Sequence, residues 1–98
     1  MDDGRDVIQS LMAPVLQWMS DGGDAWAMDI SYWRTRSALL DRLNALGPEI
    51  NTVLTELDVS LHRFEPSAER TRDQIDEQTL RAELAISIQR LRNLGALG

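Results

Sequence analysis

Apolar residues near the start of the chain recur at steps of three and four, which places them on one face of an α-helix. This pattern predicts a helix over residues 6–19. Its apolar positions are Val7, Ile8, Leu11, Met12, Val15, Leu16 and Met19. Pro14 lies inside the run, where it either kinks the helix or opens a shorter one. The following segment, Ser20–Asp24, contains two glycines and ends the helix.

A longer helix is predicted over residues 24–64, with Asp24 as its N-cap. An apolar seam runs through this segment at alternating steps of four and three, as in a heptad repeat. The seam consists of Leu39, Leu43, Leu46, Ile50, Val53, Leu57, Ser60 and Phe64. Trp26, Ile30 and Trp33 form a related stripe upstream of it. Both stripes predict helix faces that are buried against another helix.

Gly47 and Pro48 interrupt the seam without changing its phase. Because a loop between independent helices has no need to preserve phase, we favour one continuous helix with a kink at 47–48. The alternative is a break, in which Gly47 caps one helix and Pro48 opens the next.

A third helix is predicted over residues 69–94, and Thr71 and Gln74 have the spacing of a reciprocal capping pair at its start. Its first turns are almost wholly charged, with Ile75 as the single apolar residue. Later positions share one apolar face made of Leu80, Leu84, Ile88 and Leu91. Gly95 and Gly98 end the helix.

Residues 1–98 are therefore expected to form a single all-α domain, a three-helix (short–long–long) antiparallel bundle or extended hairpin. At 1.5 Å per residue the three helices would be about 20, 60 and 39 Å long, so the first and last would lie end to end along the second. Such a molecule is only two helices thick and leaves apolar surface uncovered. We therefore predict that oligomerisation or a protein partner completes the bundle.

Composition narrows the classes of function. The net charge is −6, with ten arginines and no lysine, and this sign argues against a nucleic-acid partner. The absence of cysteine excludes disulfides and thiolate metal sites. No stretch reaches the roughly 18 apolar residues of a membrane span. An acidic N-terminus predicts no cleavable signal, so we expect a cytoplasmic protein unless a dedicated system exports it.

Candidate chemistry is sparse, and we expect no catalytic, metal or cofactor site. His62 is the single histidine, and without cysteine it is a poor basis for a zinc site. Asp73, Asp76 and Glu77 are interleaved with arginines, which is typical of a solvated helix face. A small helical-bundle enzyme that binds its substrate through Arg34, Arg36 and Arg42 is the least favoured alternative.

The tryptophans are the most unusual feature. Trp18, Trp26 and Trp33 fall within 16 residues and are either core residues or a partner-binding hot spot, where tryptophan is enriched. The segment from Trp18 to Trp26 resembles the central turn of the small Trp-x-Gly proteins secreted by type VII systems. That resemblance implies a helical hairpin that pairs as a four-helix dimer, with Trp18 at the turn. Two features depart from the pattern of that family: position 20 is serine rather than glycine, and only 17 residues precede Trp18.

The sequence thus predicts a non-enzymatic helical protein–protein interaction module, such as a small adaptor, chaperone or secretion-associated factor. A self-assembling structural subunit is the second interpretation. The predicted partner-binding residues are Trp18, Trp26, Trp33, Leu39, Leu43, Leu46, Ile50, Val53 and Leu57. In this interpretation a protein partner, or a second copy, packs against the apolar helix faces.

Overall fold

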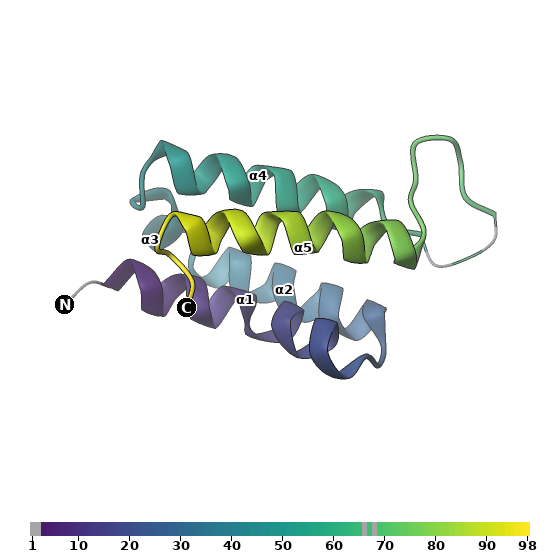
Figure 1. Cartoon of the computed structure of the whole chain (residues 1–98), viewed down its shortest axis with the longest axis horizontal. Coiled ribbons are helices and arrows are strands. Elements are labelled where there is room, and N and C mark those ends of the chain that lie inside the picture. Colours follow the sequence, from purple (N-terminus) through teal and green to yellow (C-terminus); the bar gives the residue numbers. More distant parts are fainter. Residues whose placement is uncertain (1–2, 66, 68) are drawn as a thin grey trace.

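A computed structural model of the chain describes residues 3–65, 67 and 69–98. Within this part the helices are α1 (Asp3–Asp21), α2 (Ala25–Ala38), α3 (Leu40–Asn44), α4 (Pro48–Arg63) and α5 (Glu77–Asn93). The all-α prediction is confirmed, and Figure 1 shows two antiparallel hairpins, α1–α2 and α4–α5, joined by the short α3 at one end.

The four long helices form a closed antiparallel ring. Between the hairpins, α2 contacts α4 through a hydrogen bond of 2.6 Å from the Tyr32 hydroxyl to Asp58. On the other side, the Arg81 guanidinium of α5 lies 4.0 Å from the centre of the Trp18 ring of α1. One chain therefore builds the up-down-up-down four-helix layer that we expected a second copy to complete.

The predicted helix over residues 24–64 is divided, and the continuous version is wrong. A straight helix of this length would span about 60 Å. The whole molecule measures only 45 × 25 × 24 Å. The chain bends at Leu39 and turns back after Ala45.

Local chemistry explains the reversal at 47–48. Gly47 has φ +95° and ψ 169°, a backbone conformation that is essentially restricted to glycine. Pro48 then occupies the first turn of α4, where its missing N–H costs no hydrogen bond. The Asn51 side chain donates to the carbonyl oxygens of Leu43 at 3.0 Å and Gly47 at 2.8 Å, which satisfies acceptors that the break exposes. The alternative with a break is therefore the one observed.

The third helix begins later than predicted, at Glu77 rather than near residue 69. Gln74 does accept a hydrogen bond from the Thr71 amide at 2.8 Å, but this contact closes a local turn. Ile75, the one apolar residue nearby, pairs instead with the end of α4, and its amide donates to the Arg63 carbonyl at 2.8 Å. Asp76 is the true N-cap, because its carboxylate accepts from the Thr79 amide at 2.8 Å.

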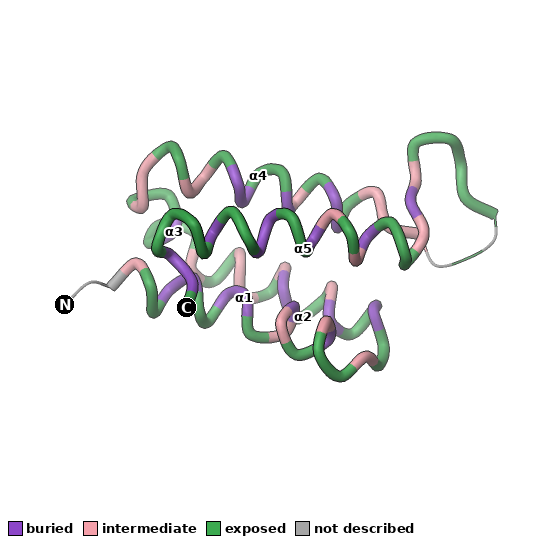
Figure 2. The backbone as a smooth tube through the Cα atoms, in the orientation of Figure 1, coloured by how far each residue is buried: buried purple, intermediate pink, exposed green. Residues whose placement is uncertain are grey.

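The core lies along the axis between the two hairpins. Figure 2 shows buried positions on the inward sides of α1, α4 and α5, with exposed positions outside. Both halves of the predicted seam face this axis, one from α3 and one from α4. The phase preserved across Gly47 and Pro48 thus reflects two helices that each need an inner face.

Candidate functional site

The predicted seam contributes to the core of the folded chain. Four seam residues are buried, namely Leu43, Val53, Leu57 and Ser60. The other four pack against the core while partly exposed, namely Leu39, Leu46, Ile50 and Phe64. The chain's own helices cover the surface that we expected a partner to cover. The buried seam residues belong to the core, and their role in binding a partner stays a prediction.

Trp18 also belongs to the core, since only 2% of its surface is exposed. Its indole N–H donates to the Gly23 carbonyl in the α1–α2 turn at 3.2 Å. The Arg81 guanidinium stacks over the ring and donates to the Met19 carbonyl at 3.4 Å. These contacts tie the end of α1 to the turn and to α5.

Trp26 has a different position, because 65% of its surface is exposed. Ile30, one turn further along α2, is 45% exposed. Trp33 follows on the same face and is half-buried. We call Trp26, Ile30 and Trp33 the aromatic face of α2. The start of this helix is set by Asp24, whose carboxylate accepts from the Trp26 amide at 2.9 Å, so Trp26 stands in the first turn.

The half-buried Trp33 is fixed by two neighbours. Its indole N–H donates to the Asp29 carboxylate at 3.0 Å. Its ring meets Tyr32 edge to face, with centroids 5.2 Å apart. Burial raises the pKa of Asp29, although the bond from Trp33 and the charge of His62 oppose this. Asp29 is thus a partly buried carboxylate at the border of the aromatic face.

A hollow of about 160 Å³ opens beside the aromatic face. It is lined by Trp26 and Asp29 of α2 and by Phe64 and Glu65, which follow α4. Phe64 is the C-cap of α4 in an extended conformation, and the Glu65 amide donates to the Ile75 carbonyl at 3.0 Å. We call these four residues the acidic notch. Two aromatic rings and two carboxylates converge there from segments far apart in the sequence.

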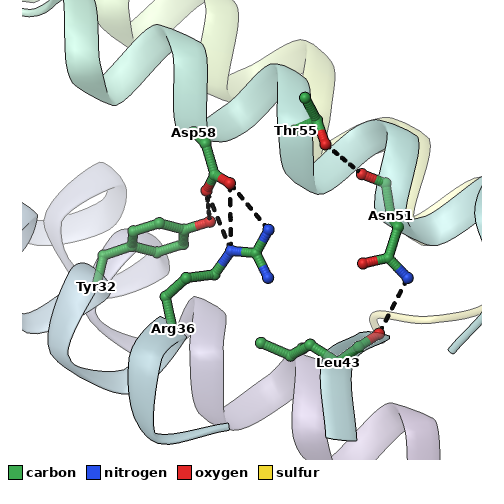
Figure 3. A network of polar contacts seen from close by, with 6 residues as sticks. All are labelled: Tyr32, Arg36, Leu43, Asn51, Thr55 and Asp58. Atoms are coloured by element: carbon green, nitrogen blue, oxygen red, sulfur yellow. Dashed lines mark hydrogen bonds and ion pairs between the residues drawn. The ribbon is translucent and has the colours of Figure 1, made fainter. Parts of the chain in front are cut away.

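A partly buried polar network holds α2 against α4 (Figure 3). The Asp58 carboxylate accepts from the Tyr32 hydroxyl at 2.6 Å and from Arg36 Nη2 at 2.9 Å. The side chains of Arg36 and Asp58 are only 13% and 22% exposed. Burial and the neighbouring Asp58 carboxylate raise the pKa of Tyr32 strongly. The network therefore sets the position of α2, and with it the aromatic face.

The remaining candidate residues form no recognisable reactive centre. Within the described part of the chain, no three histidine or carboxylate side chains are grouped as a metal site. Glu77 pairs with Arg81 at 3.2 Å, and Asp76 caps α5. Two hollows of about 370 and 380 Å³ lie elsewhere on the surface, lined by mixed polar and aliphatic side chains. Arg36, one of the three arginines of the enzyme alternative, pairs with Asp58 at 2.9 Å.

Sequence reasoning identified Trp26 and Trp33 but not Asp29, Phe64 or Glu65 as part of the same surface. The spacing of Asp29 and Trp33, four residues apart, was the one local signal for their hydrogen bond. Phe64 and Glu65 reach Trp26 only because α4 runs back along α2.

In the part of the chain that the structure describes, every helix is too short or too polar to cross a bilayer. No family model, curated protein or solved structure matches this sequence. The resemblance to the Trp-x-Gly proteins of type VII secretion stays a prediction.

Proposed function

We propose that this chain is a non-enzymatic helical interaction module, of the adaptor or chaperone kind, that binds a partner protein through the aromatic face of α2. The observation that supports this most directly is the exposure of Trp26, at 65%, next to Ile30, at 45%. The core is complete without these side chains. The two exposed side chains therefore contribute little to folding. A binding surface, which a partner covers, explains why they are apolar.

The free energy that binding gains by covering Trp26 follows from the exposed area of its side chain. A tryptophan side chain buries up to about 250 Å², so covering the exposed part of Trp26 removes roughly 160 Å² from water. At about 25 cal/mol per Å² this is worth about 4 kcal/mol before the costs of association. One such residue is enough for the energetic centre of a small interface.

We propose a segment of another protein as the partner, with apolar and basic side chains. The net charge of −6 repels a second copy and attracts a basic chain. The aromatic face is also short, whereas a stable dimer buries about 800 Å² on each subunit. Both points favour a short docked segment over self-assembly.

The test begins with a photoreactive residue at position 30 of the full chain, and with the same residue at position 86 as the control. Ile86 is 62% exposed on α5, so it is a matched apolar position on another helix. A partner that crosslinks from position 30 is then purified, and its affinity is measured by calorimetry.

Trp26→Ala should weaken this binding at least about tenfold, whereas Ile86→Ala should change it by less than about twofold. Equal affinities of these two variants, or crosslinking from position 86 alone, would contradict the proposal.

A further inference from the structure

The acidic notch contains the groups that recognise an organic cation. A tryptophan ring is the best aromatic partner for a guanidinium or ammonium group, and two carboxylates next to it supply the opposite charge. Trp26, Phe64, Asp29 and Glu65 bring these groups together in a hollow of about 160 Å³. Drug-sized ligands occupy about 300–1,000 Å³, so this hollow suits the end of a single long side chain.

The carboxylates of the notch differ from the others that the structure places between helices. Asp58, Glu56 and Glu83 each pair with an arginine. No described arginine is paired with the carboxylate of Asp29 or Glu65. Asp29 accepts from the Trp33 indole, and Glu65 accepts from the Ser67 amide at 3.1 Å. Both carboxylates are partly buried, and neither forms a salt bridge among the described residues.

The Arg70 guanidinium, which contacts the Glu65 backbone, is engaged with carbonyl oxygens. Arg70 donates to the carbonyl oxygens of Ser67 at 2.8 Å and Glu65 at 3.2 Å. His62 acts on Asp29 only through its charge. The notch therefore has room and charge for a cation that the described part of the chain does not supply.

We infer that the acidic notch binds an arginine or lysine side chain of the partner protein, which stacks on Trp26 and pairs with Asp29 and Glu65. This inference rests on the proposed function and names the chemistry of the partner's anchor residue. The cationic end lies in the notch, and apolar neighbours in the partner segment cover Ile30 and Trp33. A partly buried carboxylate is stabilised by such a pairing.

The first experiment uses small probes in place of the unidentified partner. N-acetylarginine amide and N-acetyllysine amide are titrated into the ¹⁵N-labelled full chain at constant ionic strength. N-acetylcitrulline amide, which has nearly the shape of the arginine probe without its charge, is the matched control. The three tryptophan indole N–H signals report the site, and Trp18 serves as an internal reference because it is buried.

We expect the Trp26 signal to shift saturably with the arginine and lysine probes, while the Trp18 signal stays in place. Citrulline should give no saturable shift. The affinity for the arginine probe should fall about threefold in Glu65→Gln. It should fall about tenfold when Glu65→Gln is combined with Asp29→Asn. Glu77→Gln, a change at a carboxylate of α5, should leave the binding of the probe unchanged.

Trp26→Leu tests the ring separately, because it keeps an apolar side chain at an exposed position where folding is not at risk. It should reduce the preference for arginine over citrulline, because the cation–π contact is lost while Asp29 and Glu65 remain. The preference is read from another notch signal, the Glu65 amide.

Several results would overturn the inference: no movement of the Trp26 signal, an equal response to citrulline, or unchanged binding in the double carboxylate variant. A dimer formed through α2 would also overturn the inference, because the cation in the notch would then come from a second copy and not from a partner protein. Sedimentation detects such a dimer. A different outcome is that the probes fail to bind while the partner still crosslinks from position 30 and Trp26→Ala still weakens its binding. In that case the proposed function stands and only the cationic anchor is wrong.

Discussion

Raising the pH should destabilise this protein through one side chain, the Tyr32 phenol. The chain has a single tyrosine, no cysteine and no lysine. Between about pH 9 and pH 12 no other side chain loses a proton, since arginine stays charged. Tyr32 is fully buried and donates its proton to the Asp58 carboxylate at 2.6 Å. Ionising it in place would put two negative charges in contact in a buried site.

The sign and size of the change in unfolding free energy follow from the linkage between proton binding and folding. Burial and Asp58 raise the pKa of Tyr32 in the folded chain above its unfolded value of about 10. The unfolded chain therefore releases the proton first, and stability is lost as the pH rises above 10. The slope is about 1.4 kcal/mol per pH unit, which amounts to a loss of about 2.7 kcal/mol at pH 12 while the folded phenol stays protonated.

The assay is urea unfolding followed by circular dichroism at several values between pH 8 and pH 12. Absorbance near 295 nm should show tyrosinate only as the chain unfolds. Tyr32→Phe is the matched control, and it should lose about 1 kcal/mol at pH 8 but show almost no further loss up to pH 12. A wild-type stability that is flat over this range, or an equal slope in Tyr32→Phe, would refute the reasoning.

Three further predictions concern stability at neutral pH. Asp58→Ala should cost about 2–4 kcal/mol in urea unfolding, because it leaves the largely buried Arg36 guanidinium and the Tyr32 phenol unpaired. Its control, Glu56→Ala, breaks an exposed pair with Arg90 and should cost less than about 1 kcal/mol. Similar losses in the two variants would contradict the structural role of the network. Trp18→Ala should cost about 3–5 kcal/mol and Trp26→Ala less than about 0.5 kcal/mol, and a reversed order would show that the wrong tryptophan has been placed in the core. Gly47→Ala should cost about 1–3 kcal/mol through its φ of +95°, although the space around it is open, and a neutral effect on the melting temperature would argue against the break.

Local rules anticipated many individual features. Apolar spacing identified the helical segments, Asp24 caps α2 as expected, and Pro48 opens a helix in the alternative that we considered. These features depend on backbone geometry within one or two turns, which the sequence encodes directly. The late start of α5 was missed because Thr71 and Gln74 form the expected contact in a turn that does not continue as a helix.

What covers each apolar face was decided only by the tertiary structure. Periodicity shows which side of a helix is apolar, but the same seam can be covered by a partner or by the chain itself. The reversal at Gly47 brings α4 back along α2, so half of the seam is buried by the chain's own helices.

The tryptophans show the same division between sequence and structure. The sequence by itself determined that Trp18, Trp26 and Trp33 stand on helices close to one turn. It did not separate the buried Trp18 from the exposed Trp26, because this depends on whether another helix lies opposite. Arg81 and the α1–α2 turn cover Trp18, whereas Trp26 lines a hollow at the end of α4 and stays 65% exposed. Burial is a property of the packed neighbours, and these come from distant parts of the chain.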